Sequence, residues 1–300
     1  LFIDNMLKKN KYDLTSLQDL SYKSIRRFLL KLFAEQGLDT PGLDARILIM
    51  AASQLSHADL LIKNSSIPEQ STIIKINEFM NRRIKGEPVD KIVGHKEFYG
   101  RKYTVNKNVL SPRPDTEKLV DIAISEINKS GSKNLLELGT GTGAVIISII
   151  SETKSTIATA VDISEDALMI AKHNAKAHGV SQRISFLNSS WFETVSESYD
   201  IIISNPPYIS KTEMNLLSSG VREFDPFVSL YGGEDGLEAY REIINNAGLY
   251  LNPKGVIIFE IGYLQAEAVT NLLLKNEFVD ISVAKDLSGN NRVIKAYKSR

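Results

Sequence analysis

The sequence predicts an α/β fold, in which a mostly parallel β-sheet with helices on both faces follows a small helical domain. Two observations carry this prediction. In the first part of the chain, apolar residues recur with the period of a helix and are bounded by capping residues. In the second part, short and nearly continuous apolar segments alternate with helical patterns, which is typical of parallel strands buried on both faces.

The helical domain is expected over residues 21–87. Residues 22–36 place a row of apolar side chains on one helical face. Thr40 and Pro41 mark the start of a second helix, because threonine is a common N-cap and proline is tolerated in the first turn. A further helix ends before Gly86.

Two segments beside this domain carry no clear helical pattern. Residues 1–20 are expected to be a weakly attached lead-in. In residues 88–111, apolar and polar residues alternate around Gly94 and Gly100, which predicts a linker with short strands or a hairpin.

Residues 112–300 are expected to form the α/β domain. Helical patterns such as 164–177 and 236–249 separate the apolar segments. The end of the chain differs, because two strand patterns flank a Ser-Gly-Asn-Asn turn and predict a closing antiparallel hairpin. The expected parallel strands are 134–138, 156–162, 183–187, 199–204 and 255–261.

Composition excludes several classes of protein. The 300 residues contain no cysteine, so there is no disulfide, no thiol nucleophile and no cysteine-ligated zinc. The densest apolar run, Ala144–Ile150, is far shorter than the roughly 18–20 residues of a membrane span. The N-terminal residues show no signal-peptide pattern. We therefore expect a cytoplasmic protein without a membrane segment.

The charges of the two parts differ in sign. Residues 1–110 contain 18 lysines and arginines against 12 acidic residues, and residues 111–300 contain 18 against 24. A general nucleic-acid-binding protein has a stronger basic surplus, so no direct binding of nucleic acid is expected. The basic first part is typical of a solvated helical surface, although contact with an acidic or RNA-bound partner is an alternative.

A glycine-rich loop follows the first predicted parallel strand. The segment LLELGTGTGA runs from a strand through Gly139, Gly141 and Gly143 into a helix. Glycines let a backbone approach a ligand closely, and the start of a helix offers free N–H groups. Asp162 ends the next strand, where a carboxylate can bind ribose hydroxyls. The spacing also satisfies the relaxed dinucleotide pattern, so it does not by itself choose the cofactor.

Glu137 helps to choose between two cofactors. Its carboxylate lies two residues before the first glycine and would repel the pyrophosphate of NAD. It suits a cofactor with a cationic head, such as the ammonium and sulfonium groups of S-adenosylmethionine. S-adenosylmethionine is therefore predicted ahead of NAD.

A second motif, the NPPY of residues 205–208, follows the predicted strand 199–204. Ligands of open parallel sheets bind outside the carboxyl ends of the strands. The side-chain carbonyl of Asn205 and the backbone carbonyl of Pro206, whose direction Pro207 helps to fix, can accept both N–H bonds of an –NH₂ group. Tyr208 can lie flat against a planar, conjugated nitrogen group.

Two such acceptors can activate a carboxamide nitrogen without a strong base. The lone pair of this nitrogen is delocalised into its carbonyl, and holding both hydrogens turns the lone pair toward an incoming methyl group. The acceptors also favour the positive charge that grows on the nitrogen. The alternative is a tight proline turn whose tyrosine packs on the sheet edge. The cofactor loop upstream makes this alternative the less favoured one.

Trp191 and the histidines are less informative. Trp191, the only tryptophan, can cover an adenine ring or belong to the core, and the sequence leaves both open. His173 and His178 are five residues apart and do not share a helical face. No metal site and no Ser-His-Asp triad are predicted.

Taken together, GTGTGA, NPPYI and SPRPDTE (residues 111–117) behind a small helical domain resemble the bacterial release-factor glutamine methyltransferases, the HemK family. The resemblance covers nearly the whole chain from about residue 22 and extends to RRIKGEPVDKIVGHKEFYG, VREFDP, GGEDGL and DLSGNNRV. NPPY alone is shared with methyltransferases that act on the amino group of adenine. RPDTE together with the helical domain is more specific.

The resemblance implies a Rossmann-like, S-adenosylmethionine-dependent methyltransferase domain. It implies methyl transfer to the side-chain nitrogen of the glutamine in the Gly-Gly-Gln motif of class 1 peptide-chain release factors, in translation termination. The helical domain would recognise the body of the release factor, and a monomer is expected. The implied catalytic residues are Asn205, Pro206 and Tyr208, which with Pro207 would hold the glutamine amide. The implied cofactor-binding residues are Glu137, Gly139, Thr140, Gly141, Thr142, Gly143, Asp162, Trp191 and Asn205.

Some positions have two readings or depart from the family pattern. Arg113–Glu117 would lie at the mouth of the site, but the same residues also read as the start of a helix. Ser190 stands where relatives often have an acidic residue before Trp-Phe, so the resemblance does not carry over the adenine contact of that residue. Asp225-Pro226 replaces Glu-Pro, and Ser111 replaces an apolar residue.

Three rival functions have less support. A nucleic-acid adenine N6-methyltransferase needs the same grip on an –NH₂ group, but the acidic second part disfavours a phosphate-rich substrate. No element suited to presenting an unstacked base is evident. An intact NPPY speaks against a binding module that has lost catalysis. Glu137 and the lack of a hydride-transfer site speak against a dehydrogenase.

Overall fold

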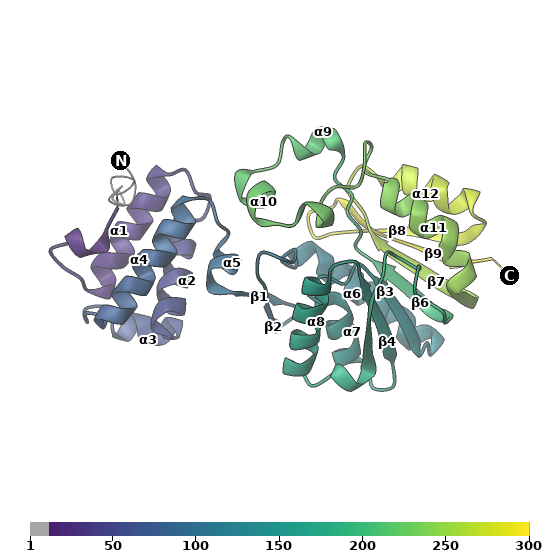
Figure 1. The fold of residues 1–300 in the computed structure, drawn as a ribbon, viewed down its shortest axis with the longest axis horizontal. Helices are drawn as coiled ribbons and strands as arrows, with labels where there is room; N and C mark the ends of the chain where they lie inside the picture. Colours follow the sequence, from purple (N-terminus) through teal and green to yellow (C-terminus); the bar gives the residue numbers. More distant parts are fainter. Residues whose placement is uncertain (1–11, 300) are drawn as a thin grey trace, which may run out of the picture. The chain divides into compact units, whose positions relative to one another are not determined.

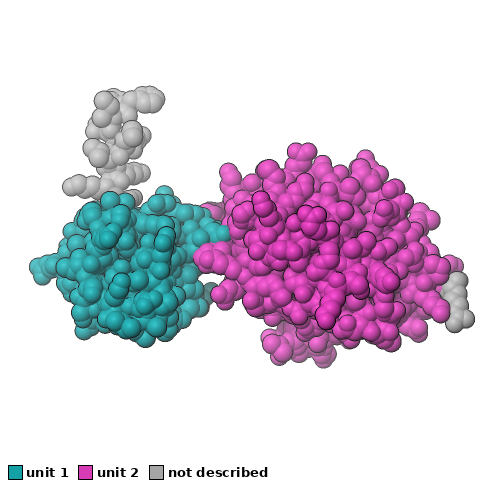
Figure 2. Space-filling model, turned by 90° about the horizontal axis from the view of Figure 1, so that it is seen from below, with its two compact units in different colours: residues 1–94 teal, residues 95–300 magenta. Residues whose placement is uncertain are grey.

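The computed structural model describes residues 12–299 and divides into two compact units after Gly94 (Figure 2). The boundary lies seven residues beyond the end expected for the helical domain at residue 87. The reason is a short helix, α5 (Val89–Val93), which follows Pro88 and ends at Gly94 in the left-handed conformation. The side chain of Ile92, in the middle of α5, is buried in the core of the first unit.

The first unit is helical. Ser21 caps its first helix by accepting a hydrogen bond from the Ser24 N–H, and the predicted helix over residues 22–36 is confirmed to within one residue. Leu29 and Phe33 of this helix pack with Leu48 and Ile76 in a common core. The four helices before α5 in this unit are α1 (Tyr22–Glu35), α2 (Pro41–Ser53), α3 (His57–Ile62) and α4 (Gln70–Ile84) (Figure 1).

The lead-in differs in part from the expectation. Residues 1–11 lie outside the described part of the chain. Beyond them, the short 3-10 turn Leu14–Ser16 packs on the helical unit, because Leu14 is fully buried and its N–H donates to Asn77 Oδ1 at 3.0 Å. The helical unit therefore begins before residue 21, with Leu14 in its core.

The second unit begins with a short antiparallel hairpin, β1 (His95–Phe98) and β2 (Arg101–Thr104). These strands are the ones expected within residues 88–111, but they belong to the α/β unit and do not form a separate linker. Tyr103 is buried in the main core of this unit, and its hydroxyl lies 2.7 Å from Ser148 Oγ.

A seven-stranded sheet forms the centre of the second unit, in the order β5-β4-β3-β6-β7-β9-β8. The pairs among β3 to β7 are parallel, and β9 pairs antiparallel with β7 and β8. This arrangement confirms the predicted parallel sheet with a closing antiparallel hairpin. The strands are β3 (Asn134–Leu138), β4 (Ile157–Asp162), β5 (Ile184–Asn188), β6 (Tyr199–Ser204), β7 (Leu251–Glu260), β8 (Phe278–Lys285) and β9 (Asn291–Lys298).

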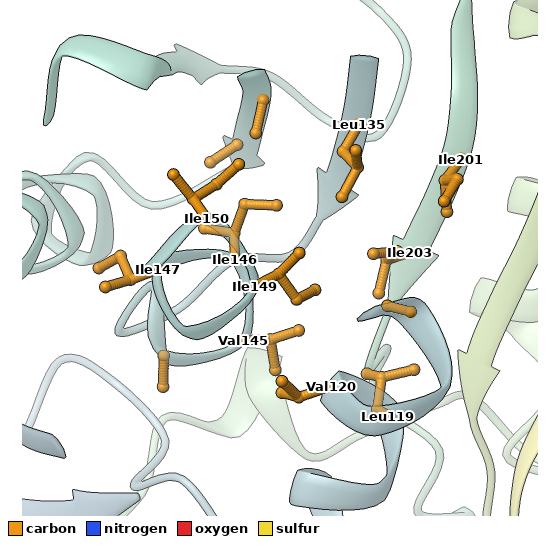
Figure 3. Close-up of a cluster of buried hydrophobic side chains, with 14 of the residues drawn as sticks. Leu119, Val120, Leu135, Val145, Ile146, Ile147, Ile149, Ile150, Ile201 and Ile203 are labelled. Carbon is orange, nitrogen blue, oxygen red and sulfur yellow. The ribbon is translucent and has the colours of Figure 1, made fainter. Parts of the chain in front are cut away.

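Helices cover both faces of the sheet, and successive strand residues alternate between two cores. Leu135, Ile201 and Ile203 face a core that includes α7, as Figure 3 shows, whereas Leu136 and Ile202 face the opposite core. On the first face lie α6 (Glu117–Ser130), α7 (Ala144–Glu152) and α8 (Glu165–Ala177), and on the second lie α11 (Glu238–Tyr250) and α12 (Ala266–Lys275).

A long connection joins β6 to α11 and carries two short helices, α9 (Lys211–Met214) and α10 (Ser219–Phe224). Neither was predicted, since a helix of four to six residues shows no clear periodicity. Among the described residues, no helix is both long and apolar enough to cross a membrane.

Candidate active site

The site lies where the strand order of the sheet reverses. From β3 the chain proceeds outward through β4 and β5, and it then returns to place β6 on the other side of β3. Ligands of such sheets bind at this switch point, outside the carboxyl ends of the strands. Leu138 and Ser204 end β3 and β6 and pair in register, and the buried Ser204 Oγ donates to the Leu138 carbonyl at 2.8 Å. The glycine-rich loop and NPPY therefore start side by side.

A cavity of about 500 Å³ opens at this point. It is lined by polar groups from the ends of β3, β4 and β6 and by apolar side chains from the connection after β6. Most of the predicted site residues line it, namely Glu137, Gly139, Thr140, Gly141, Thr142, Asp162, Trp191, Asn205 and Pro207.

The three positions in the loop require glycine for different structural reasons. All have positive φ, at 72° for Gly139, 54° for Gly141 and 75° for Gly143. A Cβ on Gly143 would lie 2.8 Å from Ile147 Cδ1 of α7 and 3.2 Å from Ala171 Cβ of α8, so this glycine allows the start of α7 to pack against α8, and it does not line the cavity. A Cβ on Gly141 would meet no atom within 4 Å, so the backbone there is open to a ligand.

Asp162 holds the glycine loop from the end of β4. Its Oδ2 accepts a hydrogen bond from the Gly141 N–H at 2.8 Å, and its Oδ1 accepts one from the Ser164 N–H at 2.9 Å. Burial raises the pKa of this carboxyl, and the backbone N–H donors oppose the shift.

Glu137 is buried in the wall of the cavity and accepts a short hydrogen bond from the Thr140 hydroxyl. Burial raises the pKa of Glu137 to about 8, and the nearby Asp162 adds to the shift, so the free protein holds this carboxyl mostly protonated at pH 7. A cation bound beside it would favour the ionised form.

Trp191 lies at the border between a core and the cavity. It packs against the core that contains α11, and it also lines the cavity. Its φ of 44° is unusual for a bulky residue. A Cβ on Gly139 would lie 3.8 Å from Trp191 Cζ3, so the indole lies next to the glycine loop.

The NPPY residues lie between two cavities. Asn205 and Pro207 line the large cavity, whereas Pro206 and Tyr208 join Asn205 in lining an adjoining cavity of about 20 Å³. Within residues 12–299, the side-chain amide of Asn205 has no hydrogen-bond partner. Burial raises the pKa of Tyr208, so this side chain offers a neutral aromatic face.

Arg113–Glu117 combine the two roles that the sequence left open. Pro114–Thr116 form a 3-10 turn that leads into α6, while Arg113 lines both cavities. Asp115 pairs with Arg292 of β9 at 3.3 Å, which ties this segment to the closing hairpin. Ser190 also lines the large cavity.

Sequence reasoning missed three polar residues around the site. Asn174 of α8 is buried, and its Nδ2 donates to the Thr142 and Thr104 carbonyls at 2.9 and 3.1 Å. Glu260, at the end of β7, lines the small cavity; its Oε2 has no hydrogen-bond partner in the described chain, and burial raises its pKa to about 7. Gln265 contacts the backbone of Tyr208. The only sequence signal for the last two was their position, since Glu260 lies at the end of an apolar strand and Gln265 lies a few residues after it.

The large cavity suits a cofactor with a nucleoside and a cationic head. Its volume is in the range of small-molecule sites. Gly141 leaves backbone open to the ligand, Trp191 offers an aromatic surface, and the carboxyl groups of Glu137 and Asp162 can accept hydrogen bonds or face a positive charge.

Comparison with known proteins finds a matching protein family model for each of the two units. A family model described as the PrmC N-terminal domain matches residues 25–94, and one described as the methyltransferase small domain matches residues 116–221. The methyltransferase from Pyrococcus furiosus has a TM-score of 0.51 and 15% identity, with 73% of this chain and 97% of that chain covered, and it shares the fold. The match to the methyltransferase family model confirms the prediction of S-adenosylmethionine in preference to NAD.

Curated relatives fall into two groups by length. The bifunctional methyltransferase of Rickettsia prowazekii (strain Madrid E) is 39% identical over 277 residues, which cover 86% of this chain and 54% of the relative. The chain thus spans about half the length of such relatives.

The second group is matched over nearly its full length. The release factor glutamine methyltransferase of Agrobacterium fabrum is 39% identical over 262 residues, covering 86% of this chain and 91% of the relative. That of Nitratidesulfovibrio vulgaris is 36% identical over 266 residues, covering 87% and 90%. By this similarity, and as its motifs predicted, the chain belongs to the release factor glutamine methyltransferase family.

Proposed function

We propose that this chain transfers a methyl group from S-adenosylmethionine to the side-chain nitrogen of the glutamine in the Gly-Gly-Gln motif of class 1 peptide-chain release factors. The observation that carries the proposal is the Asn205 amide, which lies at the junction of the two cavities and has no partner within residues 12–299. A free amide in this position is available to a substrate. The names of the full-length relatives support the same substrate.

In this proposal the cofactor lies in the large cavity. Glu137, Gly139, Thr140, Gly141, Thr142, Asp162, Trp191 and Asn205 would contact it, whereas Gly143 acts through the packing of α7. When bound, S-adenosylmethionine supplies an electrophilic methyl group on a cationic sulfur. Glu137 in its ionised form would stabilise the cationic head of the ligand.

The substrate amide would be held by NPPY. The Asn205 side-chain oxygen and the Pro206 backbone oxygen accept its two N–H bonds, and Tyr208 covers its planar face. Two fixed acceptors favour the positive charge that develops on nitrogen during transfer, which is catalysis by electrostatic preorganisation. The nitrogen then loses one proton, so the product is the neutral N-methyl amide.

We further propose that the first unit recognises the body of the release factor, and that the protein works as a monomer in the cytoplasm during translation termination. Residues 1–110 have a surplus of basic side chains, whereas the catalytic part has a surplus of acidic ones. The acidic surplus of the part that carries the site disfavours a phosphate-rich substrate, and with it the adenine N6-methyltransferase alternative.

The direct test incubates the purified protein with labelled S-adenosylmethionine and either a class 1 release factor or adenine-containing single-stranded DNA and RNA. We expect label on the glutamine of the Gly-Gly-Gln motif by mass spectrometry, and none on a release factor in which that glutamine is alanine. Label on nucleic acid alone would replace the proposal with the adenine alternative.

Asp162→Ala should weaken cofactor binding by roughly 1–3 kcal/mol, which is the contribution of a lost hydrogen bond to a charged group. The variant also removes the acceptor for the Gly141 N–H. Calorimetric titration measures the change, and an unchanged affinity would remove Asp162 from the cofactor site.

Cofactor binding should also depend on pH through Glu137. Its pKa of about 8 in the free protein should fall when the cationic ligand binds, so binding releases about one proton at pH 7. Affinity should therefore rise between pH 6 and pH 8, by up to about tenfold per pH unit, and then level off. Calorimetry in two buffers of different ionisation enthalpy counts the protons. Glu137→Gln is the control, since it keeps the ligand's own ionisations, and equal proton release in both proteins would contradict the assignment.

A further inference from the structure

Gln265, the residue before α12, joins three segments of chain at the active site. Its Nε2 donates to the carbonyls of Tyr208 and Gly236, each at 3.0 Å, and its Oε1 accepts from the Gly262 N–H at 3.0 Å. The two carbonyls require the nitrogen and the N–H requires the oxygen, so the partners fix the orientation of this amide. Both of its N–H bonds are used.

The segment that Gln265 reaches continues directly from NPPY. Ile209 and Tyr231 form a parallel bridge, with the Ile209 N–H donating to the Leu230 carbonyl at 3.0 Å and the Gly232 N–H donating to the Ile209 carbonyl at 2.9 Å. The backbones are in close contact, because a Cβ on Gly236 would lie 2.4 Å from the Tyr208 carbonyl oxygen.

The four residues of NPPY are thus held by side chains at both ends. On one side Ser204 donates to the end of β3, and on the other Gln265 holds the Tyr208 carbonyl. The second contact spans 57 positions in sequence and lies in the part of the second unit that follows β7. Inside these two anchors lie the Asn205 amide and the Pro206 carbonyl, neither of which can aim at a substrate unless the segment is held still.

We propose that Gln265 is a positioning residue for methyl transfer, which holds the Asn205–Tyr208 segment in the geometry that accepts the substrate amide. This inference rests on the proposed function. Gln265 contacts neither cavity and acts only through the backbone of Tyr208 and Gly236. Its loss should affect the reaction step more than the binding of cofactor or protein substrate.

The test uses the full chain with Gln265→Met, which keeps the length of the side chain but removes both donors. We expect turnover on the release factor to fall roughly 10- to 100-fold, as for a small displacement of reacting groups. The Kd for S-adenosylmethionine and the KM for the release factor should stay within about twofold of wild type, since neither ligand is bound by Gln265. Hydrogen exchange should become faster in peptides that cover residues 205–211 and 230–237.

Asn252→Ala is the matched control. Asn252 Nδ2 donates to Asp200 Oδ1 at 2.8 Å, so it holds the opposite end of the same strand, β6. This variant should lose stability without a change in turnover or in loop exchange. Gln265→Met with wild-type turnover, or with unchanged exchange in residues 205–211, overturns the inference. If the wild-type protein leaves the release factor unmethylated, the proposed function fails, and the exchange measurement still decides whether Gln265 holds the segment.

Discussion

Asn205→Ala is expected to lower turnover on the release factor by roughly 10²–10³-fold, as for the loss of one aimed polar group in a preorganised site. The variant removes the oxygen that accepts one N–H bond of the substrate amide, and the nitrogen then keeps more of its amide conjugation. Single-turnover kinetics with saturating cofactor measure the effect on the transfer step.

The cofactor affinity of this variant should change much less, because the glycine loop, Glu137 and Asp162 remain in place. Asn205→Asp is a matched second variant, since aspartate has a side chain of the same length and keeps an acceptor oxygen, but adds a charge. It should retain more activity than the alanine variant. Near-normal turnover of Asn205→Ala would show that Asn205 does not hold the reacting nitrogen.

Gly232→Ala is expected to lower turnover by about 10²-fold, because the added methyl group must displace NPPY. Its Cβ would lie 2.6 Å from the Pro207 carbonyl oxygen and 2.8 Å from Tyr208 Cα, and both atoms belong to backbone that cannot rotate away. Steady-state kinetics give the change, and the thermal midpoint shows how much stability is lost with it.

Gly248→Ala is the control for this substitution. Gly248 lies in α11, where an added Cβ would meet no atom within 4 Å. Alanine there should stabilise the protein by roughly 0.5–1 kcal/mol and leave turnover unchanged. Equal turnover of Gly232→Ala and wild type would mean that NPPY tolerates displacement and is not held in a demanding geometry.

Much of the fold could be predicted because the parallel strands are nearly continuous in apolar residues. The strands at residues 134–138 and 199–204 were placed at their observed bounds. The predicted end of the helical domain, residue 87, falls before the observed boundary for a local reason. Pro88 looks like a helix stop, but it precedes α5, a five-residue helix too short and too rich in β-branched residues to be recognised.

The residues of the site also divide into those that the sequence predicts and those that it does not. The glycine loop and NPPY could be found because each is a contiguous motif directly after a strand. Asn174 and Gln265 could not, since each reaches carbonyls tens of positions away, 70 residues to Thr104 in one case and 57 to Tyr208 in the other. Such contacts depend on how the sheet brings distant loops together. Gly143 shows the converse, because its place in the motif suggested a cofactor contact, whereas its close neighbours show a packing role.

A crystal structure with S-adenosylhomocysteine and a peptide containing Gly-Gly-Gln tests the central claim most directly. The account predicts that the glutamine amide nitrogen lies within hydrogen-bond distance of both Asn205 Oδ1 and the Pro206 carbonyl oxygen, with its free face toward the sulfur. A complex in which these two oxygens point away from the glutamine amide, toward solvent or toward other protein groups, would contradict it.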